Sequence, residues 1–221
     1  MDRLYNSLFQ KLELYLEEQD ADKSLLYDAE SAILAKQDAE AIYTFASKFE
    51  KHLGARAQDY TNALINAGDV QYIYLFAKDV KWAITEPLLK YIIESGSAEY
   101  NYKAAVIFKN ADKKAHAEVV IESKDPHYNF LFANYVTGAD VRAHGRAVIE
   151  SGDVRQNCKF ADQVKGADVR AHLALVENSP RAELWKMEIN RMKAIVAKLD
   201  MQERNKEEIN KILKELENEP E

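Results

Sequence analysis

The histidines of this chain are the first residues whose spacing suggests chemistry. His116, His144 and His172 recur 28 residues apart, and a ladder of imidazoles is a pattern that a metal ion can use. Neighbouring helices pack about 8–10 Å apart, however, whereas the ligands of one zinc ion each lie about 2 Å from it. Tyr60 and Leu88 hold the same place in earlier copies of the pattern. We therefore predict a partly buried structural column and no metal site, with packing that is sensitive to pH if the column titrates near its ordinary pKa of about 6.5.

A second column is basic. Lys114, Arg142 and Arg170 also recur at intervals of 28, and Arg146 follows Arg142 by one helical turn. Side chains at i and i+4 project from the same face of a helix, so these residues would form a basic stripe to which an acidic peptide or a phosphate backbone could bind. The alternative is a solvated surface without a ligand, because Glu86 holds the equivalent position in an earlier copy.

No motif for catalysis or for a cofactor accompanies these columns. The sequence contains no glycine-rich phosphate loop, no His-Glu-x-x-His, no Cys-x-x-Cys and no nucleophile elbow. Its single cysteine, Cys158, replaces Tyr74, Tyr102 and Phe130 of other copies and is predicted to be a small core residue. The sequence therefore predicts no catalytic residue, no cofactor and no enzymatic activity.

A repeat with a period of 28 residues positions these columns. The turn sequences IESG (93–96), IESK (121–124) and IESG (149–152) recur at that interval. A fixed period of this length is typical of arrays in which each copy is one supersecondary unit. An earlier, degenerate copy carries three extra residues near His52. The predicted copies are residues 38–68, 69–96, 97–124, 125–152 and 153–179.

Each copy is predicted to contain two short helices. An aspartate N-cap accepts hydrogen bonds from the free amides of the first turn, proline suits the first helical position, and glycine supplies the left-handed residue that ends a helix. The expected caps are Asp69, Asp125 (followed by Pro126) and Asp153 for first helices, and Asp140 and Asp168 for second helices. The expected ends are Gly138 and Gly166 for first helices, and Gly68, Gly96 and Gly152 for second helices.

Helices of about ten residues are marginal alone in water, so the copies must stack on one another. The sequence therefore predicts an all-α fold, an α-solenoid of stacked two-helix repeats over residues 38–179. Residues 1–37 and 180–221 are predicted to be N- and C-terminal capping helices that shield the ends of the core.

Apolar spacing gives the expected register of the two ends. One N-terminal helix should carry the stripe Leu4, Leu8, Leu12 and Tyr15, and a second should centre on Leu25, Ala29 and Ile33. At the C-terminal end, a helix from about Arg181 to Leu199 should bury Ile189, Met192, Val196 and Leu199. Asp200 and Glu203 resemble a capping box, and apolar residues resume in another phase at Ile209, Ile212, Leu213 and Leu216, so a bend or a second helix is expected after Leu199.

The phrasing GADVRAH…AVIESGD…FA resembles the tandem short two-helix repeats of bacterial and bacteriophage proteins, which are similar in style to HEAT and armadillo arrays. The resemblance covers about residues 38–179. It implies an extended surface that binds a macromolecule, without naming the partner.

A third column consists of Asn101, Asn129 and Asn157, where Ile42 and Ile73 stand in earlier copies. In armadillo-type arrays a similar asparagine ladder binds the backbone of an extended peptide, so the resemblance implies a binding role for these amides. The apolar equivalents favour the alternative, in which buried amides satisfy backbone groups between neighbouring helices.

Composition narrows the class of protein. The 221 residues are 47% hydrophobic and 30% charged, with only 7 Gly and 4 Pro, which favours helices joined by short loops over β-sandwich, collagen-like or disordered chains. One cysteine cannot form an internal disulfide, and no apolar run is long enough for a membrane span, so we expect a cytoplasmic protein with no membrane partner. The net charge is −7, and residues 1–68 contain 7 Lys or Arg against 12 Asp or Glu, which disfavours a uniformly basic surface for duplex nucleic acid.

The leading functional hypothesis is a non-catalytic binding protein whose solenoid engages another protein. One form of it is a phage factor that acts on a host component in the host cytoplasm. The alternative is nucleic-acid binding along Lys114, Arg142 and Arg170, which predicts affinity that falls steeply with salt. A third hypothesis is self-association through the helices of residues 181–221, whose heptad pattern is short for a coiled coil.

Overall fold

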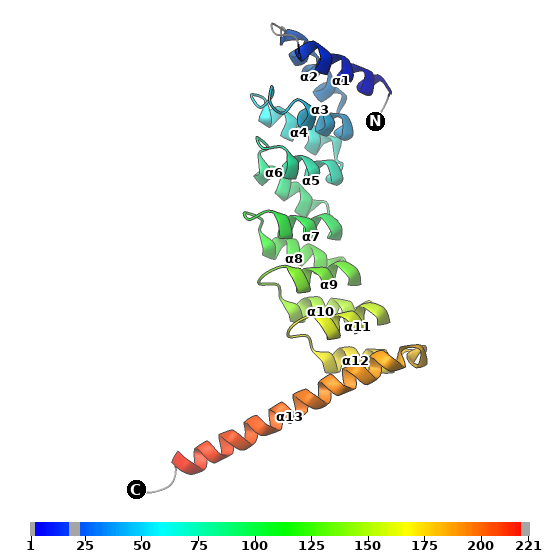
Figure 1. Cartoon of the computed structure of the whole chain (residues 1–221), viewed down its shortest axis with the longest axis vertical. Helices are drawn as coiled ribbons and strands as arrows, with labels where there is room; N and C mark the ends of the chain where they lie inside the picture. The colour runs from blue at the N-terminus through cyan, green and yellow to red at the C-terminus, as the bar shows by residue number, and fades with distance from the viewer. Residues whose placement is uncertain (1–2, 18–22, 218–221) are drawn as a thin grey trace. The chain divides into compact units, whose positions relative to one another are not determined.

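The computed structural model describes residues 3–17 and 23–217, and this part of the chain is all-helical, with no strand (Figure 1). The chain divides into two compact units, residues 1–120 and 121–221, with the division inside α8. The helices up to this division are α1 (Arg3–Leu16), α2 (Ser24–Lys36), α3 (Ala39–Lys48), α4 (Ala57–Ala67), α5 (Val70–Asp79), α6 (Thr85–Glu94), α7 (Ala98–Ile107) and α8 (Lys113–Glu122). Those that follow are α9 (Pro126–Tyr135), α10 (Val141–Glu150), α11 (Val154–Gln163), α12 (Val169–Glu177), the 3-10 helix η1 (Ala182–Trp185) and α13 (Lys186–Glu217).

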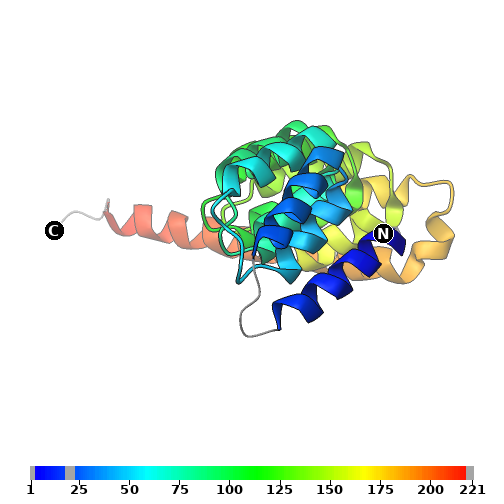
Figure 2. The same cartoon turned by 90° about the horizontal axis from the view of Figure 1, so that it is seen from above.

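Within each unit, successive hairpins stack in two layers. In the unit of residues 1–120, the first helices α3, α5 and α7 pack on one another in order, and α2, α4 and α6 form the second layer. The cyan and green helices of these hairpins accordingly overlap in the view from above (Figure 2). In the unit of residues 121–221, α9 packs on α11 and α10 on α12, while α13 packs on both α11 and α12. The predicted all-α fold of stacked helical hairpins is confirmed within each unit.

The capping residues explain why each helix begins where it does. The Asp69 carboxylate accepts a hydrogen bond from the Gln71 amide at 2.9 Å, and the Asp125 and Asp153 carboxylates cap α9 and α11 in the same way. Pro126 occupies the first turn of α9, where no amide donor is needed. Asp140 and Asp168 cap the second helices α10 and α12, as predicted.

The predicted glycines lie at the helix C-caps or one to two residues beyond them, and Lys124 takes this place after α8. Gly68, Gly96 and Gly152 adopt positive φ angles of 78°, 69° and 70° after the second helices. Lys124 holds the same position between α8 and α9 with φ 54°, a conformation that is costly for a residue with a Cβ. Gly138 and Gly166 also have positive φ but lie two residues beyond the C-caps Val136 and Val164 of α9 and α11.

The predicted N-terminal stripe is correct in part, because Leu12 is buried and Leu8 packs against the core. Leu4 is 71% exposed, whereas Phe9, which the predicted stripe omitted, is buried. The Phe9 ring packs against the rings of Phe45 and Phe49 of the next hairpin, with centroids 5.6 and 6.2 Å away, so aromatic packing sets the rotation of α1. In α2, Ala29 and Ile33 are buried as predicted, whereas Leu25 is exposed and its neighbour Leu26 is buried.

The predicted bend after Leu199 is also wrong, because α13 runs without interruption from Lys186 to Glu217. Ile189 and Met192 are buried against the core of this unit, as expected. The polar stretch of residues 202–208 is exposed throughout. Its Glu, Lys, Arg and Gln residues are good helix formers, so the helix continues even though this stretch contains no apolar residue. The side chains of Ile212 and Leu216 lie outside the described part of the chain.

Candidate functional site

The asparagine and histidine columns meet inside the hairpins. The histidine Nδ1 lies 2.7 Å from the asparagine Oδ1 in the pair Asn101–His116, 2.8 Å in Asn129–His144 and 2.6 Å in Asn157–His172. The asparagines are 0% exposed, and the histidines are at most 1% exposed. Each pair joins the first helix of a hairpin to the second helix of the same hairpin.

The backbone fixes the orientation of these amides. The Asn157 Nδ2 donates to the Val148 carbonyl of the preceding hairpin at 3.0 Å and to the Asp153 carbonyl at 2.8 Å. The Asn101 Nδ2 donates to the Ile92 and Ser97 carbonyls in the same way. Because the amide nitrogen is used as a donor, Oδ1 must be the acceptor, and the histidine Nδ1 must carry the proton.

The asparagines therefore do not form the peptide-binding ladder that the armadillo resemblance implied. Asn101, Asn129 and Asn157 are closed off from the surface by the packing of the hairpins. The alternative interpretation, in which buried amides satisfy backbone carbonyls between neighbouring helices, describes what the structure shows.

Burial keeps the histidines neutral. Loss of hydration lowers the pKa of His144 and of His172 to about 4, and Asp140 and Asp168, which cap the same helices, oppose the shift only weakly. Burial also lowers the pKa of His116. The His144 and His172 rings stack on Phe132 and Phe160, with ring centroids 4.8 Å apart in both cases. The column is thus a neutral, structural element at pH 7.

Three of the four predicted basic residues come together in one groove of the unit of residues 121–221. Arg142 and Arg146 of α10 and Arg170 of α12 line a groove of about 550 Å³, which we call the arginine groove. Leu199 of α13 forms part of its wall. Its remaining lining residues come from α10 and α12 and the turn between α11 and α12, and they are Val141, Gly145, Ile149, Gly166, Ala167, Asp168, Val169, Ala171 and His172.

The three arginines differ in their partners. The Arg170 guanidinium binds the carboxylates of Asp200 and Glu203 on α13, at 2.5 and 3.0 Å. Arg142 and Arg146 are exposed and form no ion pair with any carboxylate in the described residues. The groove therefore combines an arginine that already holds acidic side chains with two that are free to bind an anion.

Lys114 is not brought into this groove. It is exposed on α8 in the other unit, where its backbone amide donates to the Asp112 carboxylate that caps the helix. The predicted stripe of four residues is thus represented in one unit by Arg142, Arg146 and Arg170, and in the other by Lys114 alone.

Sequence reasoning missed two features of the groove. The first is the acidic pair Asp200 and Glu203, which was assigned to a helix cap and instead binds Arg170. The second is Gly145, which lies in the middle of α10, where glycine destabilises a helix by about 1 kcal/mol relative to alanine. A glycine away from any repeat boundary was the available signal that something approaches the helix closely.

The single cysteine of the chain, Cys158, is buried. Burial raises the pKa of the Cys158 thiol to about 11, which disfavours the reactive thiolate. In residues 3–17 and 23–217, no three His, Cys, Asp or Glu side chains gather as metal ligands. Among the helices in these same ranges, none has the length and apolar character that a membrane span requires.

Comparison with known proteins adds no family to this description. No protein-family model matches the chain, and neither a curated protein nor a solved structure is similar to it.

Proposed function

We propose that this protein is a non-catalytic binding protein that holds an acidic segment of another protein in the arginine groove. The observation that carries the proposal is the pair of exposed guanidinium groups, Arg142 and Arg146, beside an arginine that already binds two carboxylates. Guanidinium groups bind carboxylates in a forked geometry, which makes arginine well suited to such recognition.

The contact of α13 with Arg170 is an internal example of the proposed interaction. Asp200 and Glu203 are three residues apart on one helix and present both carboxylates to a single guanidinium. A partner helix or extended segment with a similar acidic spacing would bind Arg142 and Arg146 by the same chemistry.

A protein partner is favoured over the alternative of nucleic acid along Lys114, Arg142 and Arg170. A phosphate backbone would have to displace Asp200 and Glu203 from Arg170, whereas an acidic segment needs only the two unpaired arginines. The resemblance to short repeats of bacterial and bacteriophage proteins supports a setting in a bacterial cytoplasm. In that setting this HEAT- and armadillo-like protein is a phage factor, and its partner is a protein of the host.

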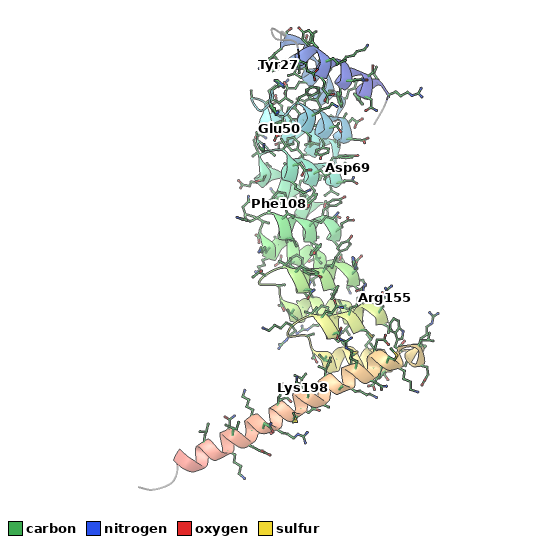
Figure 3. The ribbon with its side chains drawn as sticks, in the orientation of Figure 1. Tyr27, Glu50, Asp69, Phe108, Arg155 and Lys198 are labelled. Atoms are coloured by element: carbon green, nitrogen blue, oxygen red, sulfur yellow. The ribbon has the colours of Figure 1, made fainter. Side chains whose placement is uncertain are left out.

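Affinity capture with charge-reversed variants tests this proposal. The wild-type chain and Arg142→Glu plus Arg146→Glu are immobilised and exposed to a bacterial lysate, and bound proteins are identified by mass spectrometry. The matched control reverses two exposed residues outside the groove, Arg155 on α11 and Lys198 on α13 (Figure 3). A protein that binds the wild type and the control but not the groove variant supports the proposal. Enrichment of nucleic acid alone, with a steep salt dependence, would favour the alternative.

Exposed apolar side chains near the end of α13 support self-association as a further candidate function. Ile209 and Leu213 are 57% and 52% exposed on the last turns of the helix. Replacing both with Glu leaves the buried anchors Ile189 and Met192 in place, so light scattering on this variant separates self-association from loss of the fold. A mass that stays monomeric before and after the change excludes self-association through these residues.

A further inference from the structure

One of the three histidines is placed differently from the other two. The Nε2 atoms of His116 and His144 are buried and have no hydrogen-bond partner among the described residues. His172, by contrast, lines the arginine groove, although only 1% of its surface is exposed. Its ring therefore lies at the floor of a groove whose walls carry Arg142, Arg146 and Arg170.

Gly145 is what opens the groove above His172. A Cβ at this position would lie 3.4 Å from the His172 Nε2 and 3.2 Å from the Phe160 ring, so even one carbon atom would cover the nitrogen. The equivalent residues of the other copies, Thr61, Leu89, Ala117 and Leu173, all have a side chain.

The His172 Nε2 offers a lone pair and not a proton. Its Nδ1 proton is donated to Asn157, whose orientation is fixed by two backbone carbonyls. The charged groups around the ring are Asp168 and Arg170 on its own helix, Arg142 and Arg146 on α10, and Asp200 and Glu203 on α13, while α11 contributes the uncharged Asn157 and Phe160. Together with burial, the neighbouring arginines favour the neutral ring.

A cationic groove with a hydrogen-bond acceptor at its floor selects among anions. Carboxylates, sulfate and the phosphodiesters of nucleic acid are fully ionised at neutral pH and bring no proton to an acceptor. A phosphomonoester has a second pKa of about 6, and inorganic phosphate also keeps at least one proton near that pH. Among these anions, only such a phosphate group can accept from arginine and donate to the His172 Nε2 at the same time.

We infer that the arginine groove is a binding site for a phosphate group that retains a proton, with its hydroxyl donating to the His172 Nε2 and its other oxygens accepting from Arg142 and Arg146. The inference rests on the proposed function, which it deepens: the acidic segment of the partner carries a phosphomonoester. Gly145 is the residue that sets this specificity, because it exposes the acceptor.

Phosphate and sulfate distinguish this site from a simple cationic patch. Both are tetrahedral, but sulfate lacks the proton. Calorimetric titration of the full chain at about pH 6, where inorganic phosphate keeps at least one proton and sulfate keeps none, should give a Kd for inorganic phosphate at least tenfold below that for sulfate. Equal affinities, or tighter binding of sulfate, would overturn the inference.

A measurement on the wild type keeps the test independent of any variant that fails to fold, and two variants add to it. In the wild type, the ¹⁵N shift of the His172 Nε2 should move on addition of phosphate while those of the buried His116 and His144 stay fixed. Gly145→Ala should reduce the preference for phosphate over sulfate to within about twofold, and Arg142→Gln should weaken both anions. An unmoved His172 signal at saturating phosphate contradicts the proposed hydrogen bond.

Binding of peptides shows whether the phosphate belongs to a protein segment, and it distinguishes failure of the phosphate inference from failure of the proposed function. A short glutamate-rich peptide with one phosphoserine is compared with the same peptide carrying Glu at that position. Tighter binding of the phosphopeptide than of either inorganic phosphate or the Glu peptide assigns a phosphorylated protein segment. Equal binding of the two peptides refutes the phosphate inference and leaves the proposed function standing, and binding of neither peptide refutes both.

Discussion

The interiors of α3–α6 and of α9–α12 differ in polarity at a pair of positions that face each other within each hairpin. The hairpins α3–α4 and α5–α6 fill these positions with Ile42 and Tyr60, and with Ile73 and Leu88, all 0% exposed. The later hairpins fill them with a buried asparagine and a buried histidine. The two positions change together because a lone asparagine or histidine in this interior would leave a polar atom unsatisfied, and such an atom destabilises a fold by about 1–3 kcal/mol.

The largest consequence of this difference should appear on acidification. The pKa of His144 and His172 is about 4 when folded and about 6.5 when unfolded, so the unfolded state binds more protons below pH 6.5. Stability is therefore complete above about pH 6.5 and is lost as the pH falls toward 4. At pH 5 the two residues together should reduce the free energy of unfolding of residues 121–221 by about 4 kcal/mol.

The two tryptophans allow each unit to be followed separately in this experiment. Trp82 lies between α5 and α6, and Trp185 lies in η1, so Trp185→Phe and Trp82→Phe leave one reporter in each unit. Urea unfolding at pH 7 and pH 5 should show the larger loss for Trp185. Equal losses at both reporters would contradict the comparison.

A double-mutant cycle breaks one polar pair at neutral pH. Asn129→Ile alone leaves the His144 Nδ1–H without a partner, and should reduce the free energy of unfolding by about 1–3 kcal/mol. His144→Leu alone should have a similar effect. Changing both reproduces the apolar pair Ile73–Leu88, so the double variant should be more stable than the sum of the single changes predicts. Additive effects would show that the two side chains are not coupled.

The reverse exchange should transfer acid sensitivity to the apolar hairpin. In Ile73→Asn plus Leu88→His, the new amide can donate to the Leu64 and Asp69 carbonyls, which correspond to the carbonyls bound by Asn157. We expect an additional loss of about 2 kcal/mol between pH 7 and pH 5, measured by urea unfolding with Trp82 as reporter. The matched control Ile73→Asn, which lacks the histidine, should be less stable at both pH values and gain no acid sensitivity.

The smallest expected effect concerns the connection between α8 and α9. Lys124→Gly removes the strain of φ 54° but adds flexibility to the unfolded chain, so the net gain in stability should be about 0.5 kcal/mol. Gly152→Lys at the equivalent position, with φ 70°, is the matched control and should reduce stability. Thermal unfolding of both variants measures the effect, and a loss of stability in Lys124→Gly would show that the Lys124–Glu150 ion pair outweighs the strain.

The hairpins and their boundaries could be predicted because they depend on local chemistry. Asp125 and Asp140 specify where helices begin through contacts with amides two or three residues away, and Pro126 suits the first turn because no donor is needed there. Both polar columns were visible as well, but as separate columns. Their pairing depends on how two helices face each other across 15 residues, which a pattern within one helix does not contain.

The features that were predicted wrongly or missed also depend on contacts between segments distant in the sequence. Phe9 is buried because of the rings of Phe45 and Phe49, and Asp200 is engaged because α13 passes Arg170. Both contacts join segments about 30 or more residues apart in the sequence. The exposure of the His172 Nε2 likewise depends on the absence of a side chain at Gly145 in the preceding hairpin.

The position of α13 also determines how this array can grow. It packs on α11 and α12, where the first helix of another repeat would otherwise add to the stack. A second molecule therefore cannot join at this end by continuing the repeat, and head-to-tail polymerisation into open fibres is blocked there by the chain's own last helix.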